Sequence, residues 1–113
     1  MTTGAKGEQM AADYLIRSGY DIVARNVRSR WGEVDIIASR GEDLAFVEVK
    51  SWSTLDKENL AQSIGAVKQR RIRSTAQSFL ARRPELRERR IRFDVIFIPG
   101  GGDAGVDHME GAF

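Results

Sequence analysis

The sequence predicts an α/β fold in which helices flank a single mixed sheet. Two segments with helical spacing, Gly4–Ser18 and Ser63–Ala81, enclose three consecutive strand-like segments. An apolar strand, Ile91–Ile98, follows the second helix. The predicted order is therefore helix, three strands, helix, strand and a short tail. With 113 residues, the chain has the length of one domain, spanning residues 1–113.

The composition excludes several kinds of site. The chain has no cysteine and a single histidine, His108, so neither thiolate nor histidine-rich metal centres are expected. No apolar run reaches the length of a membrane span, and Met1–Gly19 lacks the apolar core of a signal peptide. We therefore expect a cytoplasmic protein that does not enter a membrane.

The charge is unevenly distributed along the chain. The net charge is only +2, yet the segment Lys68–Arg92 carries ten Lys or Arg residues against two acids, Glu85 and Glu88. A basic surface beside an acidic centre indicates a polyanionic partner such as nucleic acid. A solvated basic face without a ligand is the alternative, and the charge pattern leaves both open.

The first predicted helix carries an apolar stripe and ends at a glycine. Helical spacing brings together Ala11, Ala12, Leu15 and Ile16. Thr3 is positioned as an N-cap, and Gly19 as the helix stop. Glu8 lies on the side of this stripe, so its carboxylate points inward. It either stabilises the helix start or reaches a site on the sheet.

A strand is expected next, over Tyr20–Arg30. Apolar residues at its start are followed by three arginines, Arg25, Arg28 and Arg30. This strand leads directly into a hairpin, which gives an antiparallel meander of three strands. The arginines either contact phosphates or protect an exposed sheet edge.

The central hairpin lies within Trp31–Lys50. Two β-branched-rich runs, Val34–Ala38 and Leu44–Val49, are joined at Gly41-Glu42, and a glycine at the first turn position suits a type II′ turn. With the turn centred between these two residues, Asp35 faces Glu48 and Glu33 faces Lys50. The four charges then share one face and one end of the hairpin, whereas Val34, Ile36, Val47 and Val49 form an apolar opposite face.

Opposed carboxylates on a sheet are unfavourable unless a cation lies between them. Mg²⁺ or Mn²⁺ is the natural candidate because both prefer oxygen ligands. Lys50 would lie beside that metal and hold a water molecule or a phosphate oxygen. The alternative is a solvent-facing sheet end in which Glu33 and Lys50 form an ordinary ion pair.

The second half of the chain predicts a loop and a basic helix. In the loop Ser51–Gln62, Trp52 either packs on the core or stacks on a base. The second helix turns Ile64, Val67, Ile72, Ala76, Phe79 and Leu80 inward. Its outer face carries Lys68, Arg70, Arg71 and Arg73. Gln62 and Lys68 lie near the helix start, from which their side chains can point to the site.

Ile91–Ile98 is apolar on both faces apart from Asp94, which predicts an interior strand. Because a helix precedes it, we expect this strand to run parallel to the one before that helix. In the terminal segment, the apolar residues that can dock on the fold are Val106, Met109 and Phe113.

These residues resemble a known family. An acid in one hairpin strand, Asp35, followed by Glu48-Val49-Lys50 in the next, is similar to the PD-(D/E)xK nucleases, which have a restriction-endonuclease-like αβββαβ fold. Over nearly the whole chain the sequence resembles the YraN family (UPF0102-type) of bacterial endonuclease-like proteins. The matching motifs are GxxGExxAxxYL from Gly4, GEVDIIA from Gly32, FVEVK from Phe46, RFDVIFI, and a terminal AF.

The resemblance implies roles for individual residues. Asp35 and Glu48 would bind the metal with the Val49 carbonyl, and Lys50 would orient or activate the attacking water. Glu8 looks like the first-helix glutamate of archaeal Holliday junction resolvases. The remaining expectations are Glu33 and Gln62 as supporting residues around the metal ligands, and Trp52 in a position where the family often has arginine.

The function expected from this resemblance is Mg²⁺-dependent hydrolysis of DNA phosphodiester bonds, with structured or branched DNA as a candidate substrate. The basic residues would hold backbone phosphates: Arg25, Arg28, Arg30, Lys68, Arg70, Arg71 and Arg73. A homodimer would suit cleavage of two strands. A non-catalytic nucleic-acid-binding module and an interaction domain with a structural acidic cluster are the alternatives.

Overall fold

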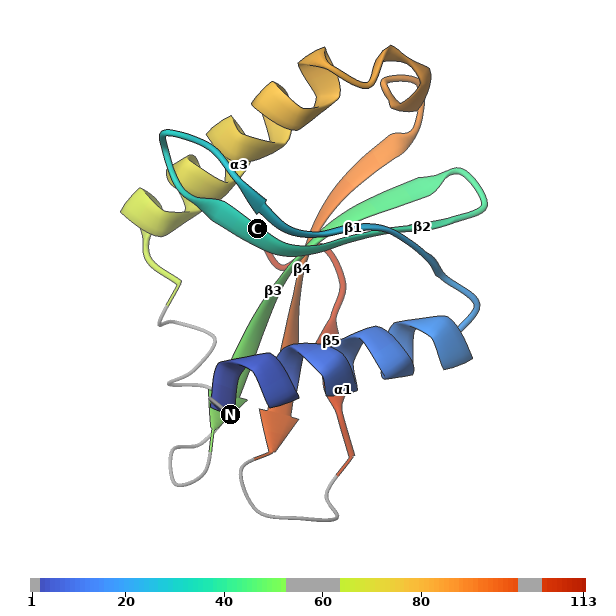
Figure 1. Ribbon diagram of the computed structural model, residues 1–113, viewed down its shortest axis with the longest axis vertical. Helices are drawn as coiled ribbons and strands as arrows, with labels where there is room; N and C mark the ends of the chain where they lie inside the picture. Colours follow the sequence, from blue (N-terminus) through green and yellow to red (C-terminus); the bar gives the residue numbers. More distant parts are fainter. Residues whose placement is uncertain (1–2, 53–63, 100–104) are drawn as a thin grey trace.

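The computed structural model describes residues 3–52, 64–99 and 105–113. Within them the elements follow the predicted helix, three-strand, helix, strand order (Figure 1). They are α1 (Thr3–Arg17), β1 (Asp21–Arg28), β2 (Glu33–Arg40), β3 (Asp43–Trp52), α3 (Ala66–Ala81), the short 3-10 helix η1 (Pro84–Leu86), β4 (Arg90–Pro99) and β5 (Asp107–Met109). The α/β class and the restriction-endonuclease-like order αβββαβ are confirmed, with β5 as an addition.

The five strands form one mixed sheet in the order β1-β2-β3-β4-β5. Strands β1 to β3 are an antiparallel meander. Strand β4 runs parallel to β3 and is interior, as predicted, because β5 pairs with its other edge in the antiparallel sense. The crossover through α3 makes this parallel pairing possible.

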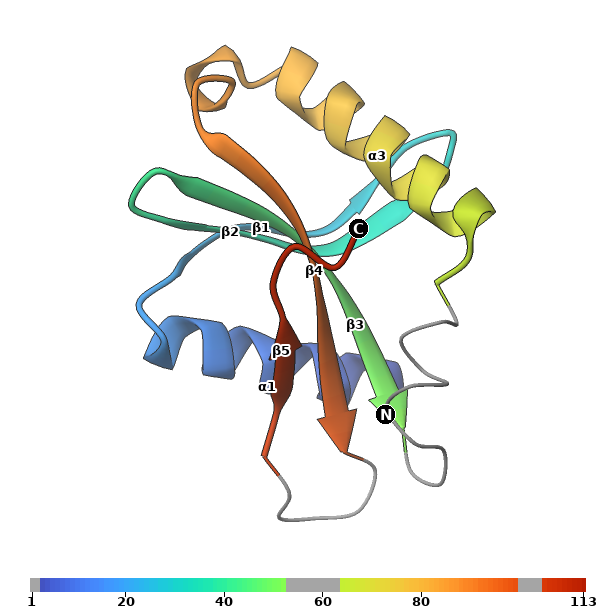
Figure 2. The same cartoon turned by 180° about the vertical axis from the view of Figure 1, so that it is seen from behind.

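One helix covers each face of the sheet (Figures 1 and 2). Helix α1 packs its Leu15 against a buried cluster that contains Ile36, Val47 and Ile96. Helix α3 packs on the other face, where Ile72 and Ala76 meet Ile37, Leu44 and Phe46. Full burial of one such aliphatic side chain stabilises the fold by roughly 1.5–3 kcal/mol, so these two layers fix both helices to the sheet.

Several helix positions differ from the prediction. Ile16 and Val67 were expected to point inward, but their exposed fractions are 56% and 52%. Ile16 follows fully buried Leu15 and lies about 100° further round the helix, beyond the buried stripe. Helix α3 begins at Ala66, later than predicted, with Gly65 as its N-cap. Val67 therefore lies in the first turn and lines an open groove.

Strand β3 is longer than predicted. Ser51 and Trp52, expected in a loop, pair with Ile98 and Pro99 of β4 and extend the parallel ladder. The rest of the predicted loop, including Gln62, and the predicted helix start at Ser63 lie outside the described residues. In the terminal segment Val106 and Phe113 dock as expected, whereas Met109 is 37% exposed.

Two glycines make the predicted chain reversals. Gly19 (φ +92°) ends α1, and the Tyr20 N–H donates to the Leu15 carbonyl at 2.9 Å, which is a Schellman cap. Gly41 (φ +59°) lies at the hairpin turn, and the φ of Glu42 is not positive, as a type II′ turn requires. The hairpin register is as predicted from Arg40–Asp43 to Ile36–Val47.

Beyond that last pair, β2 and β3 separate. Pairing of β2 with β1 continues to Arg28–Glu33, whereas its pairing with β3 stops at Ile36–Val47. Glu33 is therefore bonded to Arg28 (3.2 Å), and the predicted pairing of Glu33 with Lys50 is wrong. Because sheets twist, β2 follows β1 away from the β3–β4 pair, and a fork opens at Asp35 and Glu48.

The same fork changes the face on which Val34 is buried. It was predicted to share an apolar face with Ile36, Val47 and Val49, which all pack in the α1 layer. Val34 instead packs in the α3 layer with Ile37 and Phe46. The strand alternation that predicted its position does not hold across the point where β2 leaves β3.

Candidate active site

Asp35 lies at the fork, where its side chain bonds to a backbone N–H of β3 that has no β2 pairing partner in the ladder. Its Oδ2 accepts the Val49 N–H at 2.8 Å. Burial, which is the largest cause, and the neighbouring Glu48 charge together raise the pKa of Asp35 from 3.8 to about 7, although the Val49 hydrogen bond opposes the rise. The carboxylate is thus in a place that disfavours its charged form.

Glu48 is the second carboxylate of the pair, and only 7% of its side chain is exposed. Its Oε2 lies 2.5 Å from the Lys68 Nζ of α3 and 3.9 Å from the Lys50 Nζ. Glu48 and Lys50 are two residues apart on β3, so both point toward the α3 face. Two cations thus converge on one buried carboxylate oxygen.

The two lysines are electrostatically different. Burial lowers the pKa of Lys50, and the neighbouring Lys68 lowers it further. Burial also disfavours the charge on Lys68, but hydrogen bonding and attraction to Glu48 outweigh this effect and hold the pKa of Lys68 above its ordinary value. Lys68 therefore acts mainly as the counter-charge of Glu48, and Lys50 is the cation that loses its proton more readily.

Helix α1 brings a third acid toward the pair. The helix approaches β3 closely at Gly7, where an added Cβ would lie 2.9 Å from the Ser51 Oγ. The next residue, Glu8, is half-buried, and its charge contributes to the raised pKa of Asp35. The predicted inward position of Glu8 is confirmed, and its carboxylate belongs to the electrostatic surroundings of Asp35.

The donor set fits a hard divalent cation. Protein-bound Mg²⁺ uses one or two carboxylates and completes its octahedron with water or substrate phosphates. Asp35 and Glu48 supply two carboxylates, and a cation between them would relieve their repulsion. Within residues 3–52, 64–99 and 105–113, no group of three or more His, Cys, Asp or Glu is arranged as a metal site. The pair suits a cation that protein and substrate hold jointly.

The fold thus assembles most of the residues predicted for the centre. Asp35, Val49, Glu48 and Lys50 lie together through the contacts above. Lys68, predicted on an outer basic face, turns to Glu48 instead, as its position near the helix start had also allowed. Glu33 forms an ion pair with Arg28 and lines the same groove as Asp35 and Glu48.

The predicted phosphate-binding arginines have different surroundings in the structure. Arg28, Arg30 and Arg71 line an open groove of about 600 Å³ beside the β1–β2 turn. Arg25 donates to the Gln9 side chain of α1 (3.0 Å). Of the other two α3 arginines, Arg70 is exposed and the guanidinium of Arg73 lies 4.6 Å from the centroid of the Phe93 ring. The side chain of Trp52 is not among those described.

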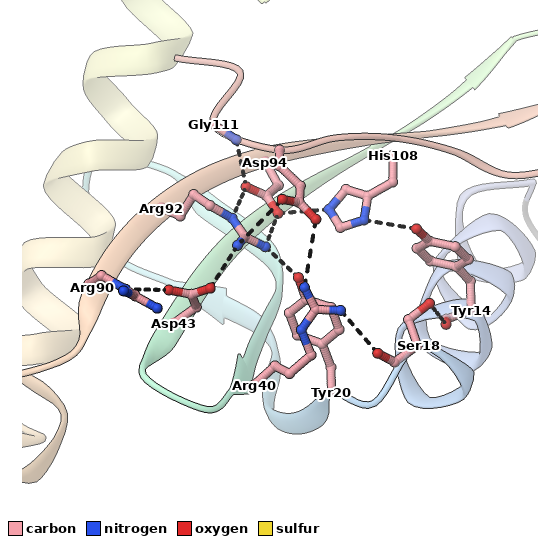
Figure 3. Close-up of polar contacts among 11 residues, drawn as sticks. Tyr14, Ser18, Tyr20, Arg40, Asp43, Arg90, Arg92, Asp94, His108 and Gly111 are labelled. Atoms are coloured by element: carbon pink, nitrogen blue, oxygen red, sulfur yellow. Dashed lines mark hydrogen bonds and ion pairs between the residues drawn. The ribbon is translucent and has the colours of Figure 1, made fainter.

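A buried polar network was missed by the sequence analysis (Figure 3). Asp94 is fully buried and accepts hydrogen bonds from Arg92, His108 and the Gly111 N–H at 2.7–3.0 Å. His108 also contacts the Tyr14 hydroxyl of α1 at 3.0 Å. Burial raises the pKa of Asp94, but these donors outweigh it and leave the pKa below its ordinary value. The network joins β4, β5 and α1. The sequence signal that could have revealed it is Asp94, the charged residue within an apolar strand.

Comparisons with known proteins identify the family. The family model described as "Uncharacterised protein family UPF0102" matches residues 7–98. A UPF0102 protein of Rhodococcus opacus (strain B4) is 44% identical over 115 residues, covering 100% of this chain and 97% of the relative. Others, from Syntrophotalea carbinolica (43% over 114 residues, 100% and 92%) and a Synechococcus species (40% over 118 residues, 97% and 89%), are similarly related. No helix within the described part of the chain is long and apolar enough to cross a membrane. The chain belongs to the UPF0102 family.

Proposed function

We propose that this UPF0102 protein is a Mg²⁺-dependent endonuclease that hydrolyses phosphodiester bonds in DNA. The observation that carries the proposal is the pair of carboxylates, half-buried Asp35 and buried Glu48, at the fork of β2 and β3 with Lys50 beside them. Two repelling acids in a partly buried place cost stability. Such costs are characteristic of functional sites rather than of purely structural ones.

In this proposal Asp35 and Glu48 hold the cation, with the Val49 carbonyl as the third ligand that the resemblance to PD-(D/E)xK nucleases implies. When bound, Mg²⁺ supplies Lewis-acid polarisation of the scissile phosphate and makes a water molecule more acidic. The Val49 N–H fixes the Asp35 carboxylate through its 2.8 Å hydrogen bond. Asp35 is therefore held in one orientation before substrate binds.

Lys50 positions the attacking water and assists its deprotonation. Its lowered pKa brings it closer to the range in which an amine exchanges protons with water. The water oxygen forms the new bond to phosphorus, the sugar oxygen leaves with the electron pair of the broken bond, and that oxygen takes up a proton. In the free protein the Lys68 ammonium group neutralises Glu48. When substrate binds, the same ammonium group can form an ion pair with a phosphate oxygen instead.

The groove beside the site supplies phosphate contacts without base recognition. Arg28, Arg30 and Arg71 line it, and arginines bind phosphate oxygens through their fixed fork of donors. Structured or branched DNA is the substrate form suggested by the likeness of Glu8 to the first-helix acid of Holliday junction resolvases. A twofold dimer would place two such sites on two strands.

The Lys68–Glu48 ion pair favours a second candidate, a nucleic-acid-binding module without catalysis. At 2.5 Å this pair neutralises Glu48 with a protein cation and needs no metal. In that case the ion pair between Lys68 and Glu48 would persist when DNA is bound. Glu48 would then not be available as a second carboxylate ligand beside Asp35, and no metal ion would bind.

A cleavage assay separates the two candidates. Wild type, Asp35→Ala and the control Asp13→Ala, an exposed carboxylate of α1, are incubated with linear and four-way DNA in Mg²⁺, Mn²⁺ or EDTA. The nuclease proposal predicts metal-dependent cleavage by wild type and Asp13→Ala, and none by Asp35→Ala. Cleavage that survives Asp35→Ala refutes the site. DNA binding without cleavage under every metal condition establishes the second candidate.

A further inference from the structure

The turn between β1 and β2 exposes a tryptophan. Trp31 is 45% exposed, although large aromatic side chains usually bury most of their surface. The guanidinium of Arg30 lies over the indole ring at 5.1 Å from its centroid. Trp31 therefore presents an aromatic surface that is already in contact with a cation.

The turn that carries Trp31 is fixed by hydrogen bonds. The Ser29 N–H donates to the Gly32 carbonyl at 2.8 Å, and the Trp31 N–H donates to the Ser29 Oγ at 3.1 Å. The Ser29 hydroxyl is also bonded to the Thr75 hydroxyl of α3 at 2.7 Å. A Cβ on Gly32 would lie 3.2 Å from the Arg71 Cβ, so turn and helix are in close contact here. The exposure of Trp31 is thus a property of a well-anchored turn.

Trp31 lies between the basic groove and the carboxylate pair. It lines the open groove of about 600 Å³ that Arg28, Arg30 and Arg71 also line. It also lines a second groove, of about 550 Å³, whose walls include Asp35 and Glu48. The two grooves share Trp31, Gly32, Glu33 and Arg71, so the indole borders any strand that occupies both.

We propose that Trp31 stacks on an unpaired base of a DNA strand whose phosphates lie against Arg28, Arg30 and Arg71. The inference rests on the proposed nuclease function and deepens it, because it names DNA with unpaired nucleotides beside the cleaved phosphate as the substrate class. A base inside a duplex is stacked on both faces and cannot offer one to the indole. An unpaired base can, and base–aromatic stacking flanked by cations is how proteins hold single strands.

The test measures binding by the full chain in EDTA, so that no cleavage is involved. Fluorescence anisotropy compares a labelled oligothymidylate with a blunt duplex of two separate, fully paired strands for wild type, Trp31→Ala, Trp31→Phe and the control Ile16→Ala. Ile16 is an exposed apolar residue of α1, outside both grooves. We expect Trp31→Ala to weaken oligothymidylate binding roughly tenfold, Trp31→Phe to retain most of the affinity, and duplex binding to change less than about twofold.

Two results would overturn the inference. In one, Trp31→Ala binds the oligothymidylate as wild type does, or loses affinity for strand and duplex equally. In the other, Trp31→Ala disrupts a dimer seen by sedimentation while DNA affinity is unchanged, which would make the indole a contact between copies. Failure of the nuclease proposal is distinct: it appears as absence of cleavage in Mg²⁺ or Mn²⁺, whatever the oligothymidylate affinities are.

Discussion

Replacing Asp35 by asparagine should stabilise the metal-free protein at pH 8. The carboxylate is half-buried beside Glu48, and its charge is unfavourable there. Asparagine has nearly the same shape, and its amide oxygen can still accept the Val49 N–H that Oδ2 now accepts at 2.8 Å. The substitution therefore removes the charge and keeps the hydrogen bond.

The magnitude follows from the raised pKa of Asp35. A rise from 3.8 to about 7 corresponds to about 4 kcal/mol at 1.36 kcal/mol per pH unit. Partial exposure and screening reduce this figure, and we expect a stabilisation of about 1–2 kcal/mol, or roughly 3–8 °C in melting temperature.

The expected pH dependence has a definite sign. Between pH 3.8 and about 7, the folded protein holds a proton on Asp35 that the unfolded chain has released. The unfolding free energy of wild type therefore falls as pH rises through this window. Asparagine does not titrate, so this contribution should be absent from Asp35→Asn.

Urea unfolding in EDTA at pH 5 and pH 8 checks both expectations. The control is Asp94→Asn, in which the replaced carboxylate is fully buried but accepts hydrogen bonds from Arg92, His108 and Gly111. That substitution should destabilise the protein. If Asp35→Asn lowers the unfolding free energy at pH 8 by 1 kcal/mol or more, the carboxylate pair is not strained and the reasoning is refuted.

Three further predictions follow from the same contacts. Mg²⁺ at about 100 times its Kd should stabilise wild type by roughly 2.7 kcal/mol and so raise its melting temperature. Glu48→Gln should lose this rise in a melting experiment, and an undiminished rise would mean that the cation binds elsewhere. Lys68→Met should lower the unfolding free energy in metal-free urea unfolding by about 1–3 kcal/mol, because Glu48 loses its 2.5 Å partner. It should also lower the Mg²⁺ concentration needed for half-maximal stabilisation. The control Arg70→Met should change the unfolding free energy by less than about 0.5 kcal/mol, and equal effects of the two substitutions would contradict a specific pairing of Lys68 with Glu48. The stability that Asp94 contributes is present above its unfolded pKa and is lost as pH falls through its lowered folded pKa. In Asp94→Asn the loss of unfolding free energy on acidification should therefore be smaller than in wild type by about 2–4 kcal/mol. An equal loss in the two proteins would contradict the lowered pKa of Asp94.

The hairpin register was predictable because it depends on a local signal. A two-residue turn at Gly41-Glu42 fixes which residues face each other, and the structure has that register from Arg40–Asp43 to Ile36–Val47. The fork beyond it was not predictable from the hairpin. It depends on β2 following β1 rather than β3, which is decided by the twist of the whole sheet, and the predicted pairing of Glu33 failed for that reason.

The role of Lys68 was only partly visible in the sequence. Helical spacing identified a basic helix, but four neighbouring cations look alike in a one-dimensional pattern. Packing of α3 on the sheet decides that Lys68 reaches Glu48, that Arg73 stacks on Phe93, and that Arg71 lines a groove with Trp31. The start of α3 at Ala66, rather than at Ser63, also changed which residues its first turn contains.

The Asp94 network was beyond the reach of sequence patterns for a different reason. Its partners come from four places in the chain, and His108 reaches Asp94 only because the tail returns as β5 beside β4. A charge in an apolar strand predicts that some partner exists, but it does not identify that partner.

Single-turnover cleavage by Lys50→Met tests the central claim most directly, because it separates DNA binding from bond breaking. Lys50 lies 3.9 Å from the Glu48 carboxylate, where we assign it to the attacking water. With excess protein and Mg²⁺, we predict DNA affinity within about threefold of wild type and a cleavage rate lower by roughly 100-fold or more. Cleavage by Lys50→Met at the wild-type rate would contradict the proposed active site.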